Sequence, residues 1–131
     1  MKPHFHRHSL ILRVSCLLLV VVVPGAAHSQ VATSPRAHVA APNIFKIIAE
    51  GQQQRVMEGT LKPGQKTPPL SHPPGSVVYY LTDCKLKATE SGVDIDTSPT
   101  AGTVRITPLV NSLTRLNVGK SDCRMLIVER Q

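Results

Sequence analysis

The chain has 131 residues, enough for one ordinary domain and too few for two. It carries 15 Lys and Arg against 8 Asp and Glu, a formal net charge of +7, and only 3% of its residues are aromatic. Because proteins that bind nucleic acid usually combine a basic stripe with stacking rings, the scattered charges and scarce rings argue against a nucleic-acid partner.

The first 29 residues have the layout of a secretory signal peptide. A basic start, residues 1–13, precedes an apolar run, residues 14–23, which ends at Pro24-Gly25 and is followed by small residues. The run is about half as long as the roughly 20 residues of a transmembrane helix, so we expect no stable membrane anchor after processing. Cleavage after Ala27 or Ser29 would leave twelve basic against eight acidic residues. We therefore expect an exported protein, periplasmic or extracellular.

Two cysteines follow the leader, Cys84 and Cys123. An even number of cysteines in an exported chain favours a disulfide, which would stabilise a domain by about 4 kcal/mol for a loop of this length. Two separate buried thiols are the alternative, and the sequence leaves both open. A redox role is disfavoured, because the two residues are not in a Cys-x-x-Cys arrangement.

The domain is expected to begin at residue 43. Residues 30–42 are small, polar and interrupted by prolines, which is typical of a flexible lead-in. Residues 43–50 are apolar enough for a strand or a helical turn. The sequence thus predicts a single domain over residues 43–131.

Residues 54–61 read as a strand, with Met57, Gly59 and Leu61 on one face. Glycine within a strand is typical of a bulge or of a close approach by another part of the chain. Pro63-Gly64 then predicts a turn, because proline presets one backbone angle and glycine accepts a positive φ.

A proline-rich loop is expected to present His72 and to lead into an apolar strand. Residues 77–81 are five β-formers in succession, which predicts a strand covered on both faces. Tyr79 and Tyr80 lie on opposite faces of this strand, so one of them could supply a hydroxyl to a pocket.

Residues 84–98 predict a hairpin with Ser91-Gly92 as its turn, so that Glu90 faces Val93 and Lys87 faces Asp96. Apolar side chains then share one face, and the charged side chains share the other, which we expect to be solvated. We therefore do not interpret its two aspartates as a carboxylate pair for acid–base catalysis. The apolar set is Leu86, Ala88, Val93 and Ile95, and the charged set is Lys85, Lys87, Asp94 and Asp96.

Further short strands are predicted around residues 104–106, 112–118 and 125–129. The total is seven or eight strands, with no amphipathic helix and no internal repeat. This pattern predicts an all-β fold, an antiparallel sandwich or barrel.

Spacing within residues 54–130 resembles that of the small single-domain bacterial cupins. Gly64 is followed by five residues and then by position 70, Ser71 and His72, similar to the first cupin motif of glycine, five residues and His-x-His. Leu113 and Asn117 are similar to the ends of the second motif, His-x-x-x-Asn. The resemblance implies an RmlC-like antiparallel jelly roll, and it implies that a homodimer could form.

Four positions of the cupin pattern usually hold metal ligands, three histidines and a glutamate. Here those positions hold Leu70, His72, Val77 and Leu113, and Cys84 stands at the closing glycine of the first motif. A divalent metal needs three or four convergent N, O or S ligands, and only His72 offers one. The resemblance therefore implies a degenerate metal site, and no cofactor is expected.

The expected function is that of an exported, non-catalytic cupin-fold protein, either a binding module or a structural and interaction module. Replacing metal ligands with leucine and valine makes the space apolar, so it either fills as core or holds a small apolar molecule. The candidate pocket residues are Leu70, His72, Val77, Tyr79 and Leu113. The alternative is a metal-dependent enzyme, a dioxygenase or isomerase, in which His72 binds metal with non-standard partner ligands. No other catalytic residues are indicated, because no Ser-His-Asp, phosphate-loop or cofactor signature is present.

Overall fold

The computed structural model describes residues 33–131. It has one short helix, α1 (Ala37–Ala40), and nine strands: β1 (Phe45–Glu50), β2 (Gln54–Leu61), β3 (Leu70–His72), β4 (Ser76–Tyr80), β5 (Leu86–Glu90), β6 (Val93–Thr97), β7 (Val104–Thr107), β8 (Val110–Asn117) and β9 (Cys123–Arg130). The all-β prediction is confirmed. The predicted loop around His72 contains the additional strand β3, which brings the number to nine. The predicted signal peptide, residues 1–29, lies outside the described residues.

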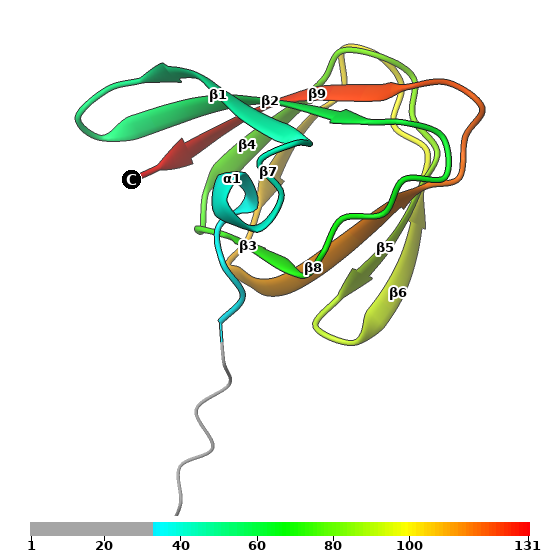
Figure 1. Ribbon diagram of the computed structural model, residues 1–131, viewed down its shortest axis with the longest axis horizontal. Helices are drawn as coiled ribbons and strands as arrows, with labels where there is room; N and C mark the ends of the chain where they lie inside the picture. The colour runs from blue at the N-terminus through cyan, green and yellow to red at the C-terminus, as the bar shows by residue number, and fades with distance from the viewer. Residues whose placement is uncertain (1–32) are drawn as a thin grey trace, which may run out of the picture. The chain divides into compact units, whose positions relative to one another are not determined.

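The nine strands form two antiparallel sheets that enclose a common interior (Figure 1). One sheet has the order β1-β2-β9-β4-β7 and the other the order β3-β8-β5-β6. The chain passes between sheets at every connection from β2 to β9 except the β5–β6 hairpin, so β9 lies between β2 and β4, and β8 lies between β3 and β5. This topology is the predicted jelly roll.

Strands β2 and β9 supply much of the core. Their register runs without a shift from Gln54 opposite Arg130 to Leu61 opposite Cys123, and alternate side chains of both strands are buried. The predicted close approach at Gly59 is present, because a Cβ there would lie 2.8 Å from Cε1 of Phe45. Any larger residue at position 59 would displace the Phe45 ring.

Strand β4 differs from its prediction. Val78 and Tyr80 are buried, whereas Val77 is half-buried and Tyr79 is 40% exposed. The run of β-formers is therefore covered on one face only, since nothing within the described residues packs over the outer face of this sheet as a third layer. The residue types of this run favour a strand, but apolar and polar residues do not alternate in it, so the sequence does not show which side faces inward.

The β5–β6 hairpin has the predicted register, with Glu90 opposite Val93 and Lys87 opposite Asp96. Its turn residues Ser91 and Gly92 both have positive φ, at 49° and 84°, as the primed hairpin turns require. The apolar face is covered only on β5: β6 is the edge strand of its sheet, and its Val93 and Ile95 are 62% and 39% exposed.

Residues 33–42, expected within the flexible lead-in, are docked on the domain. The Ser34 backbone N–H donates to the Asn111 carbonyl at 2.9 Å, and the Ser71 N–H donates to the Pro35 carbonyl at 2.8 Å. Ala37 is fully buried, and α1 lies against β1 and β3 (Figure 1). The small, proline-interrupted composition suited a short docked segment as well as a flexible one.

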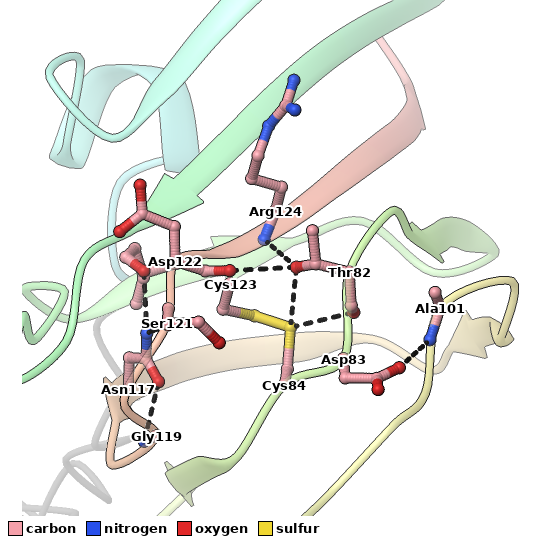
Figure 2. The surroundings of a disulfide bond; sticks show 11 residues. Thr82, Asp83, Cys84, Ala101, Asn117, Gly119, Ser121, Asp122, Cys123 and Arg124 are labelled. Carbon is pink, nitrogen blue, oxygen red and sulfur yellow. Dashed lines mark hydrogen bonds between the residues drawn. A yellow bond between two sulfur atoms is a disulfide. The ribbon is translucent and has the colours of Figure 1, made fainter.

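Cys84 and Cys123 form the predicted disulfide (Figure 2). Cys84 lies in the connection from β4 to β5, and Cys123 is the first residue of β9, so the bond ties the connection that enters one sheet to a central strand of the other. The Thr82 hydroxyl beside it accepts from the Arg124 N–H at 2.9 Å and donates to the Asp122 carbonyl at 3.0 Å. In residues 33–131 we find no helix with the length and apolar character needed to cross a bilayer.

Candidate ligand-binding cavity

A cavity of about 160 Å³ opens into the interior between the two sheets. Strands β4 to β8 all contribute to its wall, and its deeper residues include Val78, Tyr80, Leu86, Ala88, Val110 and Leu113. Ile95 of β6 and Ile106 of β7 also line it and are 39% and 74% exposed, which places the mouth at the free edges of these two strands.

Only Leu113 of the pocket residues expected from the sequence lines this cavity. Leu70 pairs directly with Leu113 across β3 and β8 and is fully buried in the core. Val77 and Tyr79 lie on the outer face of β4, and the inward positions of that strand are held by Val78 and Tyr80. The structure thus places the tyrosine beside the cavity at position 80 rather than 79.

His72 is a core residue and not the loop histidine that its proline neighbours suggested. It lies on β3 opposite Val110 and is 1% exposed. Its Nε2 lies 3.4 Å from a terminal guanidinium nitrogen of Arg115, and its Nδ1 has no partner among the described residues. Burial first, and then the charges of Arg115 and Arg36, lower the pKa of His72 to about 3. His72 is therefore neutral at physiological pH.

The residues at the cupin ligand positions do not fit a metal. Leu70 and Leu113 face each other where the motif resemblance places two imidazoles, Val77 is on the outer face, and His72 lies beside a guanidinium cation. Over residues 33–131 there is no group of three or more His, Cys, Asp or Glu side chains arranged to hold a metal ion. His72 alone cannot supply the three or four ligands that a divalent metal needs, so these positions do not form a metal centre.

Arg115 is the cavity residue that the sequence interpretation missed. It lies on β8 between the inward residues Leu113 and Asn117, and it is 6% exposed. Among the described residues its guanidinium has one hydrogen-bonding neighbour, His72, and no ion pair with an acid. Burial lowers the pKa of Arg115, while Tyr80 and Glu90 act to raise it. Successive side chains of a strand point to opposite faces, so Arg115 shares a face with Leu113 and Asn117. This spacing was the signal that could have placed Arg115 inside the barrel.

Asn117, which ends the second motif, has a structural task. Its side-chain nitrogen donates to the Leu61 carbonyl at 2.8 Å. The same nitrogen donates to the Ser121 carbonyl at 2.9 Å, and the side-chain oxygen accepts from the Gly119 N–H at 2.9 Å (Figure 2). Asn117 thereby joins the end of β8 to the end of β2 and fixes the turn that leads to β9.

Comparisons with known proteins point to one fold. No protein-family model matches the chain, and no curated protein matches it in sequence. Among solved structures, a cupin domain from Bordetella pertussis Tohama I is similar with a TM-score of 0.62 and 18% identity, over 67% of this chain and 92% of that one. An RmlC-like cupin family protein with a double-stranded β-helix fold from Methanocaldococcus jannaschii has a TM-score of 0.56 and 9% identity, over 66% of this chain and 78% of that one.

A polyketide cyclase from Streptomyces resistomycificus is also similar, with a TM-score of 0.55 and 16% identity, over 66% of this chain and 64% of that one. Its name states one activity, and other similar structures are described only as cupins, so the likeness concerns architecture. The strand order, the two facing sheets and these similarities together show that the described domain has the cupin fold, the RmlC-like double-stranded β-helix.

Proposed function

We propose that this domain is a non-catalytic binding module that holds a small molecule in the barrel cavity. The observation that carries the proposal is the cavity itself: it lies inside the barrel and has a wall of aliphatic residues around a few polar groups. Binding sites for small molecules usually combine an apolar wall with a small number of placed polar groups.

The proposal also accounts for the leucines at the ligand positions. Leu70 and Leu113 are packed against each other, so the space of the lost ligands has partly filled as core, and the remaining cavity lies on the side of Leu113 toward β5 and β7. No observation favours the alternative of a metal-dependent enzyme that uses His72. Stoichiometric metal that is lost in His72→Ala would contradict the proposal.

A cavity-filling variant tests whether ligands enter this cavity. Ala88 lies on the cavity wall, whereas Ala49 is exposed on β1, so Ala88→Met and Ala49→Met add the same atoms inside and outside. A panel of small molecules of about six to ten non-hydrogen atoms, the size class of a cavity that holds benzene, is screened by saturation-transfer NMR. We expect binders whose signal is lost in Ala88→Met and kept in Ala49→Met; binders kept by both would place binding elsewhere.

We further propose that the domain acts after export, in a periplasmic or extracellular setting. The leader layout of residues 1–29 supports this, and the disulfide is consistent with an oxidising compartment. Intact-mass analysis of protein recovered from cell fractions is expected to show a product beginning after Ala27 or Ser29. A product that retains Met1 and remains inside the cell would contradict export.

A further inference from the structure

Arg115 brings a positive charge into the barrel that the described residues do not neutralise. Its guanidinium carries five N–H donors, and among residues 33–131 its only side-chain hydrogen bond is with His72 Nε2, at 3.4 Å. Buried charges in proteins are normally paired and hydrogen-bonded, because removing an ion from water is costly. The buried Arg115 therefore has donors to spare on a residue that lines the cavity.

The other polar groups around the cavity leave this charge in place. His72 is neutral, since its pKa is lowered to about 3. Glu90 and Arg105 line the wall with opposite charges, and Glu90 does not form an ion pair with Arg115. Tyr80 lines the same cavity, and its hydroxyl makes no hydrogen bond to a described residue. The cavity thus combines a surplus positive charge with a free hydroxyl donor.

The rest of the wall determines the size and polarity of the remainder of a ligand that carries a negative group. The buried aliphatic residues of the wall are Val78, Leu86, Ala88, Val110 and Leu113, and Ile95 and Ile106 lie at the mouth. A cavity of about 160 Å³ is comparable to one that accepts a benzene ring. The matching ligand therefore has a compact apolar body of about one ring or a short branched chain.

We propose that the cavity binds a small organic monocarboxylate. Its carboxylate accepts hydrogen bonds from the Arg115 guanidinium and the Tyr80 hydroxyl, and its apolar body packs on the aliphatic wall. A guanidinium matches the two oxygens of a carboxylate in geometry, and one guanidinium with Glu90 nearby suits one negative charge better than the two of a phosphate. This inference rests on the proposed function, that the cavity holds a small molecule, and adds the charge and the size of that molecule.

Benzoate and benzamide have nearly the same shape but differ in charge, so comparing their affinities tests whether the cavity prefers a negative group. Both are titrated calorimetrically into the purified protein at neutral pH, and into Arg115→Met and Arg105→Met. We expect the unsubstituted protein to bind benzoate at least about tenfold more tightly than benzamide, as for a charge-assisted hydrogen bond. Arg115→Met should lower the benzoate affinity by about tenfold or more and leave that of benzamide within about threefold. Arg105→Met removes the same charge nearer the mouth and is expected to have the smaller effect.

The outcomes separate this inference from the function on which it rests. Equal binding of benzoate and benzamide, unchanged in Arg115→Met, would overturn the carboxylate inference and leave the cavity as a binding site. Loss of benzoate binding in Arg105→Met but not in Arg115→Met would also overturn it. Binding of neither compound would contradict both proposals.

Glu90→Gln provides a second test that does not alter Arg115. If Arg115 has no acidic partner within the protein, this variant should lose only little thermal stability, because Glu90 attracts Arg115 without forming an ion pair with it. It should bind benzoate as tightly or a few-fold more tightly, because the carboxylate of Glu90 no longer repels that of benzoate. If Glu90 is instead the partner of Arg115, Glu90→Gln should lower the thermal stability markedly, because the buried guanidinium loses its partner. That result would overturn the inference even where Arg115→Met fails to fold.

Discussion

Single residues decide what this barrel can hold. Leu70 and Leu113 remove two ligand positions, and the remaining histidine, His72, is buried beside Arg115. The Arg115 guanidinium offers hydrogen bonds to an anion in the cavity. Two leucines and one histidine do not give a divalent metal ion the three or four ligands that it needs. The same strands of a cupin fold can thus present a different chemistry through a few inward positions.

The buried imidazole predicts a pH dependence of stability. The pKa of His72 is about 3 in the folded protein against an ordinary value of 6.5, so between these values the unfolded chain binds a proton that the folded protein does not. The free energy of unfolding should therefore fall as pH falls through this range, by up to about 1.4 kcal/mol per pH unit. Urea denaturation at several pH values measures the slope.

His72→Gln is the matched variant, because glutamine keeps a polar group beside Arg115 but does not titrate. The slope between pH 6.5 and 3 should be shallower in the variant. Taking the difference between the two proteins cancels the contribution of Glu129, whose pKa is raised by burial and whose effect on stability has the opposite sign. Identical slopes would show that His72 already titrates normally in the folded protein.

At the scale of elements, the N-terminal segment is held to the barrel by a buried acid. Arg36, just before α1, donates to Glu129 Oε2 at 3.3 Å and to the Arg130 carbonyl at 2.9 Å. The side chain of Glu129 is fully buried, and its Oε1 has no partner among the described residues. Among the described residues, Arg36 is thus the cation that pairs with the Glu129 carboxylate. Because the Arg36 side chain is partly exposed, solvent screening weakens the attraction between the two.

Arg36→Ala should destabilise the domain by about 1–3 kcal/mol, because it leaves Glu129 buried without its partner. The pKa of Glu129, already raised by burial, would rise further, so the loss of stability should grow as pH rises toward the new value. Chemical denaturation in a double-mutant cycle with Glu129→Gln checks the cause. If Arg36→Ala costs the same stability in a protein that already carries Glu129→Gln, the contact with Glu129 is not responsible.

The sequence predicted elements best where their side chains alternate or where a turn has defined chemistry. The β5–β6 register followed from Ser91-Gly92. Met57, Gly59 and Leu61 of β2 were predicted to share one face, and the structure shows that this face points inward. The run Val77 to Leu81 has no alternation, so its inward face could not be read, and Tyr79 was chosen over Tyr80. Arg115 was missed because a charged residue in a strand is usually solvated, and only the assembled barrel shows that β8 turns it inward.

At the scale of the whole molecule, one disulfide cross-links the two sheets in addition to the backbone connections between them. The Cys84–Cys123 disulfide spans 39 residues of sequence and joins the start of β9 to the segment entering β5. The chain-entropy model gives about 4 kcal/mol for a loop of this length, a large share of the stability of a small domain.

Reduction, or the double variant Cys84→Ala and Cys123→Ala, should therefore lower the free energy of unfolding by about 4 kcal/mol. Urea denaturation of the protein with and without a reductant measures the loss, and the double variant should show no further effect of reductant. Unchanged stability after complete reduction, verified by mass, would contradict this contribution.

The central claim is that the barrel interior, rather than the outer surface, binds a small molecule. Methyl NMR during a benzoate titration tests it directly. We expect saturable shifts for the methyl groups of Ala88, Val110 and Leu113, which line the cavity, and none for Val77 or Val118, which lie outside it. Saturable shifts confined to the outer methyl groups, or no shifts at any concentration, would contradict the claim.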